Sequence, residues 1–330
     1  MSEKTKHSAA YYIDGIVNKD RIIFSKAITI IESTNDADKI IADEILQACI
    51  AIKKQSKRIA ISGVPGAGKS TFINALGKLL IHQNHTLAIL AIDPSSSISK
   101  GSILGDKTRM EDLVSHEKVF IRPTATAGNL GGIAKKTRET ILLCEAFGFD
   151  YILVETVGVG QSETLVKNMV DLFILLLLPN AGDELQAVKR GIMEMADVIL
   201  INKSEKENEI AAKTTAVQVK NALHLLAANE NGWLPQVQLI SATENIGLDK
   251  TKEIIDSYFL KMETTNFVEH NRKNQDLFWF ESSVLEELQK AFYQNSSVQK
   301  IKDELAVKIK NNEITAVQAA KFLVDKFLEQ

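Results

Sequence analysis

The run GVPGAGKS, residues 63–70, carries the clearest chemical pattern in the sequence. It fits the phosphate-binding arrangement of Gly, four residues, Gly, Lys and Ser or Thr, and it lies between an apolar run and a helix-length segment. The ammonium group of Lys69 can neutralise β- and γ-phosphate oxygens, and the hydroxyl of Ser70 can bind Mg²⁺. The glycines that let the backbone turn its amides toward phosphate are Gly63, Gly66 and Gly68. We therefore expect a nucleoside triphosphate site here rather than an ordinary glycine turn.

Two carboxylates that follow other apolar runs are candidates for a magnesium site. Asp93 comes directly after TLAILAI, and Glu155 lies near the end of YILVET with Gly158 close behind. Mg²⁺ prefers oxygen ligands and usually keeps several waters, so carboxylates on strands beside the phosphate loop are suitable partners. Gly158, which lacks a side chain, could let a backbone amide approach the γ-phosphate. Considered singly, Asp93 could instead cap a turn and Glu155 could form an ion pair.

The run INKSE, residues 201–205, is a candidate for reading a guanine base. An ionised carboxylate only accepts hydrogen bonds, so Glu205 can take both N1–H and N2–H₂ of guanine, whereas adenine has no N1–H. Asn202 can bond the N7 and O6 edge, and the stem of Lys203 can lie across the base. The later run ISAT supplies backbone amides that can meet O6. They belong to Ser241, Ala242 and Thr243.

Three further segments have compositions that suit loops responding to a nucleotide. GSILGDKTRM (101–110) and TAGNLGGIAKKTRET (126–140) are rich in glycine and basic residues, so they can grip anions; the alternative is a surface loop followed by a solvated helix face. LPNAGDELQAVKRG (178–191) leaves an apolar run through proline and glycine and enters an acidic helix start. On residue chemistry alone, Lys189 in that segment is a surface lysine.

The elements that must position these residues alternate along the chain. Short apolar runs end in polar, glycine or proline clusters and are mostly separated by helix-length segments. The runs are RIAIS, TLAILAID, VFIRPT, YILVET, LFILLLLPN, DVILINK and VQLISA. Such a pattern predicts an α/β fold with a mainly parallel sheet covered by helices on both faces. Ligands collect beyond the carboxyl ends of the strands in these sheets, which is where the candidate residues fall.

Both ends of the chain are predicted to be helical extensions of this core. The expected parts are an N-terminal extension over 1–55, a nucleotide-binding domain over 56–265 and a C-terminal arm over 266–330. Asp20 and Asp36 are the expected caps of N-terminal helices. The flanks could be solvent-facing packing, or an arm that binds a partner or a second copy of the chain.

Bulk properties narrow the class of protein. The 330 residues have a formal net charge of −3, so no general attraction to nucleic acid or to anionic membranes is expected. The apolar run LFILLLL at 172–178 is far shorter than the roughly 18 residues of a membrane helix, and the N-terminus has no apolar signal region. Cys49 and Cys144 form no CxxC motif, and the His residues are scattered. We predict a reducing, cytoplasmic compartment without a nucleic acid or membrane partner.

The whole pattern strongly resembles the methylmalonyl-CoA mutase-associated GTPases, the MeaB and ArgK-like family of P-loop GTPases. The matching blocks are GVPGAGKST, AIDPSSS, GSILGDKTRM, FIRP, LGGIAKKTRETILLCEAFGFDYILVETVGVGQSE and LPNAGDELQAVKRGIMEMADVILINK. They cover Ile59 to Ser204 densely and the flanks more loosely.

This resemblance implies a P-loop NTPase fold and a GTPase that chaperones a cobalamin-dependent acyl-CoA mutase, in the first place methylmalonyl-CoA mutase. Such a protein gates the loading of adenosylcobalamin, protects or reactivates the mutase, and hydrolyses GTP faster when the mutase is bound. The resemblance further implies Mg²⁺ as cofactor, a homodimer formed through the C-terminal arm, and a cobalamin adenosyltransferase as an additional partner.

The same resemblance assigns roles to individual residues. Lys189 stands where a switch lysine moves toward the nucleotide when the partner binds. The residues implied in hydrolysis are Lys69, Asp93, Glu155 and Lys189. Those implied around Mg²⁺ are Ser70, Asp93, Asp106 and Glu155. Those implied in nucleotide binding are Gly63, Val64, Pro65, Gly66, Ala67, Gly68, Lys69, Ser70, Thr71, Gly158, Asn202, Lys203, Glu205, Ser241, Ala242 and Thr243.

One residue departs from the family pattern, because Glu205 stands where Asp is usual. The added methylene moves the carboxylate by about 1.5 Å, which strains a bidentate contact with guanine unless the loop backs away. The negative charge that excludes adenine is kept.

Three other functions remain open at this point. A phosphotransferase would move the γ-phosphate to a small acceptor, and a nucleotide-dependent interaction module would have negligible catalysis. A metallochaperone GTPase of related fold commonly carries His-rich or paired-Cys metal sites, which this sequence lacks.

Overall fold

The computed structural model describes residues 7–52, 54–92, 110–124, 130–156, 162–179, 190–225 and 231–329. The chain divides into two compact units, Met1–Arg272 and Lys273–Gln330. The first unit contains the sheet together with the N-terminal helices, and the second is helical where it is described. The three-part division with boundaries at 55 and 265 stays a prediction.

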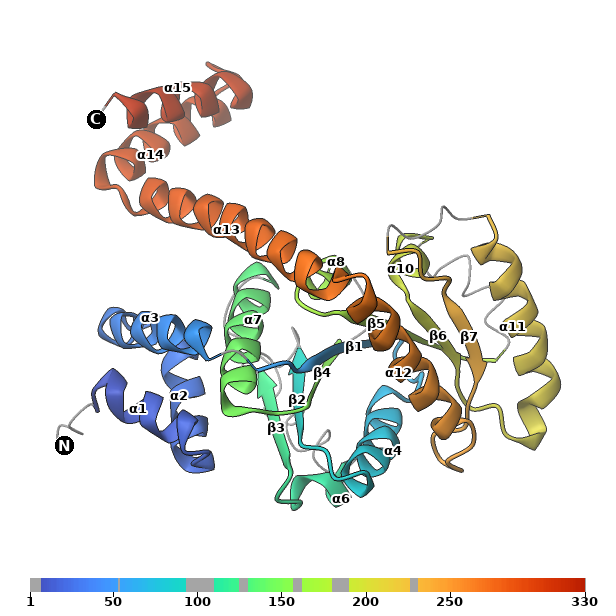
Figure 1. Cartoon of the computed structure of the whole chain (residues 1–330). Coiled ribbons are helices and arrows are strands. Elements are labelled where there is room, and N and C mark those ends of the chain that lie inside the picture. The colour runs from blue at the N-terminus through green and yellow to red at the C-terminus, as the bar shows by residue number, and fades with distance from the viewer. Residues whose placement is uncertain are drawn as a thin grey trace. The chain divides into compact units, whose positions relative to one another are not determined.

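A seven-stranded sheet forms the centre of the first unit, with the strand order β3-β2-β4-β1-β5-β6-β7 (Figure 1). Each neighbouring pair of these strands is parallel. The strands are β1 (Lys57–Gly63), β2 (Leu87–Ile92), β3 (Val119–Thr124), β4 (Tyr151–Thr156), β5 (Leu172–Leu177), β6 (Val198–Ile201) and β7 (Gln236–Leu239). Every apolar run singled out in the sequence contains or overlaps one of them, so the predicted parallel sheet is confirmed.

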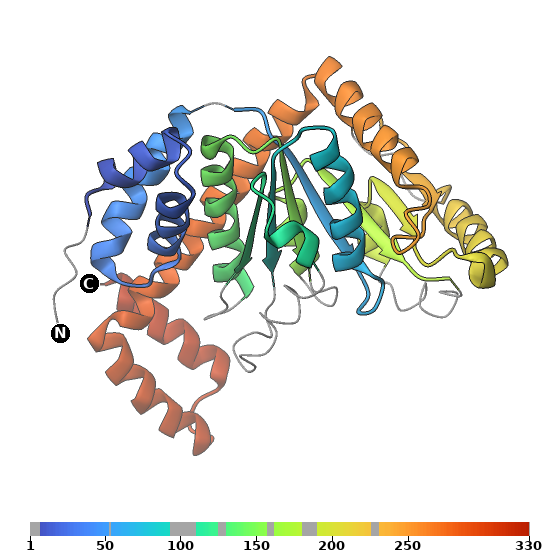
Figure 2. The ribbon, with the colours of Figure 1, turned by 90° about the horizontal axis from the view of Figure 1, so that it is seen from below.

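Helices lie against both faces of this sheet, with α4 and α7 on opposite sides (Figures 1 and 2). The helical elements that follow β1 in the first unit are α4 (Lys69–His82), α6 (Glu111–Val114), α7 (Leu130–Phe147), α8 (Ser162–Lys167), α10 (Arg190–Met195), η1 (Lys206–Asn208), α11 (Glu209–Leu223) and α12 (Leu248–Thr264). Phe72 of α4 and Tyr258 of α12 belong to one buried cluster with Ile59 and Ile61 of β1. Because Ala60 is buried as well, β1 is covered on both faces, as apolar strands of parallel sheets are.

The N-terminal helices pack against α7 and beside the edge strand β3. They are α1 (Ala9–Val17), α2 (Arg21–Glu32) and α3 (Asp36–Ala51). The ring of Phe24 in α2 lies 4.8 Å from that of Phe120 in β3 and 4.4 Å from that of Phe147 in α7, measured between centroids. Arg122 of β3 forms an ion pair with Glu32 at the end of α2. Aromatic packing and this ion pair therefore fix the extension to the sheet domain.

The predicted helix caps are correct for α2 and wrong by one residue for α3. The carboxylate of Asp20 accepts from the backbone amides of residues 22 and 23, at 2.9 and 3.0 Å. For α3, the side chain of Asn35 accepts from the amide of Ala37 at 2.9 Å. Asp36 is instead the first helical residue, where its charge still suits the positive end of the helix dipole.

The second unit has a small core of its own. Its elements are most of α13 (Phe267–Gln294), α14 (Ser296–Lys310) and α15 (Ala316–Leu328). Val298 and Leu305 of α14 pack with Ala319 and Leu323 of α15. No helix within the described ranges is both long and apolar enough to cross a membrane.

Both cysteines are buried and free. Burial raises the pKa of the Cys49 thiol to about 12. Burial, followed by the nearby Glu145 and Cys49, raises the pKa of Cys144 well above its usual value. Neither thiol is therefore a reactive nucleophile at neutral pH.

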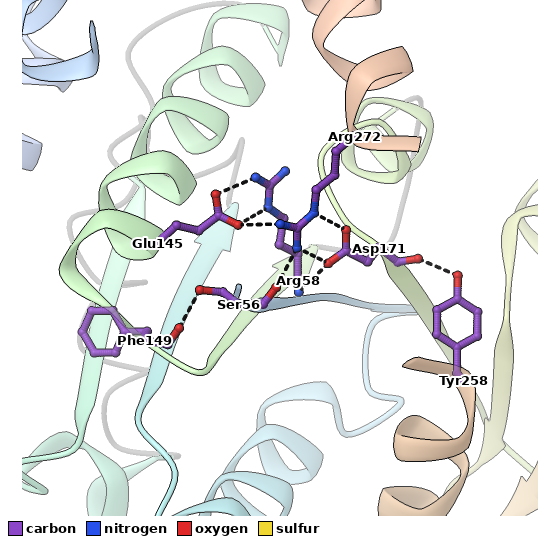
Figure 3. Close-up of polar contacts among 7 residues, drawn as sticks. All are labelled: Ser56, Arg58, Glu145, Phe149, Asp171, Tyr258 and Arg272. Atoms are coloured by element: carbon purple, nitrogen blue, oxygen red, sulfur yellow. Dashed lines mark hydrogen bonds and ion pairs between the residues drawn. The ribbon is translucent and has the colours of Figure 1, made fainter. Parts of the chain in front are cut away.

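A buried network of two arginines and two carboxylates joins the amino-terminal ends of the strands to α7 and α13 (Figure 3). Arg58 of β1 donates to both carboxylate oxygens of Glu145 in α7, at 2.7 and 2.6 Å. Arg272, in the first part of α13, donates to both oxygens of Asp171 at 2.8 and 2.7 Å, and its Nη1 lies 3.2 Å from Glu145 Oε1. These pairs fix the orientation of the planar guanidinium groups at the edge opposite the phosphate loop.

Backbone groups make three further hydrogen bonds with this network and its neighbour Tyr258. Asp171 Oδ2 accepts from the backbone amide of Arg58 at 3.0 Å, and Arg272 Nη2 donates to the carbonyl of Ser56 at 2.6 Å. The hydroxyl of Tyr258 donates to the carbonyl of Asp171 at 2.8 Å (Figure 3). Because Asp171 is only 2% exposed, these partners replace water in stabilising its carboxylate.

Replacing Arg272 with Met should destabilise the protein strongly. The variant would remove both hydrogen bonds from the guanidinium to Asp171, and breaking a buried pair from one side typically costs about 3–5 kcal/mol. Guanidinium chloride unfolding, followed by circular dichroism, measures the change in unfolding free energy.

Lys250→Met is the matched control, because Lys250 and Glu253 form an ion pair on the exposed surface of α12. Exposed pairs contribute little, so the control should unfold at nearly the wild-type denaturant concentration. Equal destabilisation by the two variants would contradict a structural role for the buried network.

Candidate functional site

The candidate site lies at the carboxyl ends of the central strands. β1 lies between β4 and β5 in the sheet, and the loop that follows β1 leads directly into α4. After α4 the chain returns as β2, beyond β4, whereas β5 lies on the other side of β1. Ligand sites of open parallel sheets form at such a change of direction.

The backbone conformation of the loop after β1 explains why two of its residues are glycine. Gly63 has φ of +151° and Gly68 has φ of +87°, values that side chains disfavour. A Cβ atom on Gly68 would also stand 2.5 Å from Nδ2 of Asn202. The loop therefore needs glycine at residue 68 for both its backbone angle and its close approach to Asn202.

Lys69, the first residue of α4, is held inside the loop. Its Nζ donates to the carbonyls of Gly63 at 2.7 Å and Val64 at 3.2 Å, and the residue is 8% exposed. The start of α4 places a positive helix end and a lysine cation next to the same loop. This arrangement favours an anionic ligand.

Ser70 and Glu155 form a pair of oxygen donors beside Lys69. Ser70 Oγ donates to Oε1 of Glu155 at 2.9 Å, and both residues are buried. The register of the sheet places Glu155 of β4 beside Ile61 of β1, two residues before Gly63. The sequence prediction that Glu155 lies by the phosphate loop is consistent with this geometry.

The donor chemistry of this pair fits Mg²⁺. A hydroxyl and a carboxylate are both hard oxygen ligands, and Mg²⁺ commonly takes one or two protein ligands together with phosphate oxygens and waters. The described residues contain no group of three or more His, Cys, Asp or Glu side chains suited to holding a metal. Ser70 and Glu155 could thus hold Mg²⁺ only together with nucleotide and water, or with residues outside the described ranges.

Asn202 joins the phosphate loop to the loop after β7. Its Nδ2 donates to the carbonyl of Ala67 at 2.8 Å, and its Oδ1 accepts from the amide of Ala242 at 3.1 Å. Asn202 is 2% exposed. The sequence predicted contacts from Asn202 and from the Ala242 amide to a base, and the structure places both groups in a bridge between loops.

Glu205 is held by two hydroxyl groups of the loop after β7. Ser241 Oγ and Thr243 Oγ1 each donate to Glu205 Oε1 at 3.0 Å. Partial burial raises the pKa of Glu205, but hydrogen bonds from its own backbone amide and from the side chains of Ser241, Thr243 and Asn208 outweigh burial, so the pKa lies below its usual value. The carboxylate is therefore ionised at neutral pH and can only accept hydrogen bonds.

The structure describes some of the remaining predicted site residues but not others. Val64 and Pro65 lie in the loop, Thr71 lies in the first turn of α4, and Lys203 is exposed with φ of +58°. Asp93, Asp106, Gly158 and Lys189 lie outside the described residues. Their predicted roles stay predictions.

Sequence reasoning missed the side-chain contacts that support the site. Thr156 Oγ1 donates to Ser62 Oγ at 2.9 Å and joins β4 to β1 directly before the phosphate loop. The hydroxyls of Ser241 and Thr243 contact Glu205, whereas the sequence analysis assigned only backbone amides of that run to the site. The presence of two hydroxyl residues in ISAT was the available signal.

Comparisons with known proteins show which proteins this chain resembles. A family model described as methylmalonyl Co-A mutase-associated GTPase MeaB matches residues 24–297. A probable GTPase of Mycobacterium bovis is 39% identical over 317 residues, which cover 95% of this chain and 94% of that protein. A mouse protein described as a mitochondrial methylmalonic aciduria type A homolog is 37% identical over 337 residues, covering 99% of this chain and 81% of that protein.

A crystal structure described as a LAO/AO transport system kinase has the same fold. It matches this chain with a TM-score of 0.78 and 31% sequence identity, and the match covers 100% of both chains.

Replacing Asn202 with Ala should loosen both loops. The variant would leave the carbonyl of Ala67 and the amide of Ala242 buried and unpaired, at about 1–3 kcal/mol for each group. We expect a lower unfolding free energy and faster hydrogen exchange at the Ala242 amide, measured by denaturant titration and by NMR.

Asn221→Ala, on the exposed surface of α11, is the control and should change neither quantity. If the Ala242 amide exchanged hydrogen at the same rate in Asn202→Ala as in the wild type, the bridging role of Asn202 would be contradicted.

Proposed function

The chain belongs to the methylmalonyl-CoA mutase-associated GTPase family, and on that premise we propose that it chaperones a cobalamin-dependent acyl-CoA mutase, with methylmalonyl-CoA mutase as the leading candidate. In this role the protein couples GTP binding and hydrolysis to the loading of adenosylcobalamin and to the protection or reactivation of the mutase. The family match over residues 24–297 carries the partner assignment, because the family description names that mutase. The cytoplasmic location remains a prediction.

GTP hydrolysis is supported by the groups gathered around Lys69. The loop amides and the start of α4 bind the phosphates, and the ammonium of Lys69 exchanges its carbonyl partners for β- and γ-phosphate oxygens. Ser70 and Glu155 would hold Mg²⁺, which would supply positive charge to neutralise the phosphates. Asp93 and Asp106 complete this region in our proposal, Gly158 offers its amide to the γ-phosphate, and the ionised carboxylate of Glu205 accepts from guanine.

A phosphotransferase is the second candidate function. The matched crystal structure bears the description of a kinase, at 31% identity to this chain. Incubation with GTP labelled in the γ-phosphate separates the two functions, because a GTPase releases free phosphate whereas a kinase transfers the label to an acceptor.

Two lysine variants test the proposed division between nucleotide binding and response to the mutase. Lys69→Ala should weaken GTP binding by roughly a hundredfold, because charge-assisted contacts to phosphate contribute about 3 kcal/mol. Lys189→Ala should leave GTP affinity unchanged and reduce only the hydrolysis that the mutase stimulates. Calorimetry measures binding, and phosphate release with and without the mutase measures stimulation.

Lys220→Ala, an exposed lysine in α11, is the control and should retain full stimulation. Lost GTP binding in Lys189→Ala would contradict its assignment as a switch residue. A wild-type protein that hydrolyses GTP but never responds to the mutase would overturn the proposed partner and leave the GTPase assignment intact.

We further propose that two copies associate through one face of α13. Of the apolar side chains on this helix that are 41–65% exposed, four follow a spacing of three, four and four residues, which places them along one side. They are Leu277, Phe280, Val284 and Leu288. A stripe of this kind suits a second helix of the same type, as in helical dimer interfaces.

Val284→Glu should weaken this association, because the variant places a charge in the middle of the apolar stripe. We expect the dimer dissociation constant to rise about tenfold or more, as measured by sedimentation velocity across a dilution series. Gln289→Glu adds the same charge at an exposed position off the stripe and should leave the dimer intact. A dimer that tolerates both changes would exclude this face as the interface.

A further inference from the structure

The hydrogen bonds of Glu205 fix the orientation of its carboxylate in addition to keeping it charged. β6 and β7 are paired in parallel, with Ile201 beside Leu239, so the loops that follow them start side by side. Glu205 comes from the first loop, and the hydroxyls of Ser241 and Thr243 come from the second. Both hydroxyls bond the same oxygen, Oε1, at 3.0 Å, and they lie 3.2 Å from each other.

We propose that Thr243 is a positioning residue that holds the Glu205 carboxylate for guanine and thereby sets the preference of the site for bases that carry a 2-amino group. The inference rests on the proposed GTP function, which supplies the ligand. Thr243 itself is not proposed to touch the reacting phosphates.

The length of the glutamate side chain makes such a holder necessary. Glu has an additional rotatable bond compared with Asp, and ordering a long polar side chain costs conformational entropy. Two guanine donors, N1–H and N2–H₂, must both meet one carboxylate, so its orientation matters as much as its charge. Bonds from two hydroxyls to Oε1 restrict that orientation before the base arrives.

The two hydroxyls hold one oxygen of the carboxylate, and the base would compete with Asn208 and with the backbone amide of Glu205 for the remaining acceptor positions. An ionised carboxylate has about four lone-pair positions on its two oxygens. The hydroxyl bonds from Ser241 and Thr243 fall on Oε1 alone. Because the pKa of Glu205 lies below its usual value, the group remains an acceptor at neutral pH.

Thr243 can be tested separately from the loop, whereas Ser241 cannot. The backbone of Ser241 exchanges two hydrogen bonds with Ile246, each at 3.0 Å, and its Oγ also accepts from the amide of Glu244 at 3.2 Å. Ser241 is fully buried, so its loss would change the turn itself. Thr243 is exposed, and its hydroxyl donates to Glu205 and lies 3.2 Å from the hydroxyl of Ser241.

The experiment compares GTP with ITP, which lacks the 2-amino group, using the full chain and calorimetry. Thr243→Val keeps the shape of the side chain and removes the hydroxyl. We expect its preference for GTP over ITP to fall about five- to tenfold, because GTP loses two aligned bonds to Glu205 and ITP loses one. Thr243→Ser restores the hydroxyl and should restore the preference.

Two further variants complete the test. Thr214→Val removes an exposed threonine hydroxyl from α11 and should leave both affinities unchanged. In a Glu205→Ala background, Thr243→Val should have no additional effect on the ratio of affinities, because the residue acts through the carboxylate.

The outcomes separate this inference from its premise. A wild-type protein that binds no guanine nucleotide, or binds GTP no better than ATP, overturns the proposed function and the inference with it. A selective wild type together with an unchanged GTP-to-ITP ratio in Thr243→Val overturns the inference alone. An equal loss of GTP and ITP affinity does so too, because it indicates general damage to the loop.

Discussion

The parallel hydrogen-bond register of the sheet is the constraint on which the site depends. It places Glu155 beside Ile61, Gly63 beside Leu176, and Ile201 beside Leu239, so five strands end together at the same edge of the sheet. Because both faces of these strands pack against helices, a slip by one residue would exchange the side chains that meet each helix layer and disrupt that packing. The 2.9 Å contact between Ser70 and Glu155 is thus a consequence of the ladder.

At the amino-terminal ends of the strands, buried ion pairs connect the sheet to neighbouring helices. Buried ion pairs contribute little net stability compared with apolar packing, but they are costly to break and specific in geometry. Arg272 joins the start of α13 to Asp171, directly before β5, and to Ser56, directly before β1. These two strands lead to the phosphate loop and to the segment that begins at Leu178. The network therefore fixes the amino-terminal ends of β1 and β5, two strands whose carboxyl ends lead to the candidate site.

The sequence allowed the strands and the phosphate loop to be predicted because their signals are local. An apolar run that ends in a polar cluster and a glycine pattern before a helix need no knowledge of distant residues. The contacts that support the site could not be found this way. Arg58 and Glu145 are 87 residues apart, and Asn202 and Ala67 are 135 apart. The cap of α3 was predicted at Asp36 but lies at Asn35. Asn and Asp have similar preferences for the N-cap position, and only the backbone geometry distinguishes the two residues.

The Asn202 bridge joins the loop proposed to contact the base to the loop proposed to hold the phosphates. Asn202 contacts Ala67 in the phosphate loop and Ala242 in the loop that also holds Glu205. Gly68 must lack a side chain to admit this amide. A base that pulls on Glu205 therefore acts on a loop that is hydrogen-bonded, through one buried side chain, to the backbone beside Lys69. Because Asn202 is buried and both of its partners are backbone atoms, a shift of the backbone at Ala242 is passed to the backbone at Ala67 through a single ordered side chain. The loop proposed to read the base and the phosphate loop are therefore coupled through Asn202.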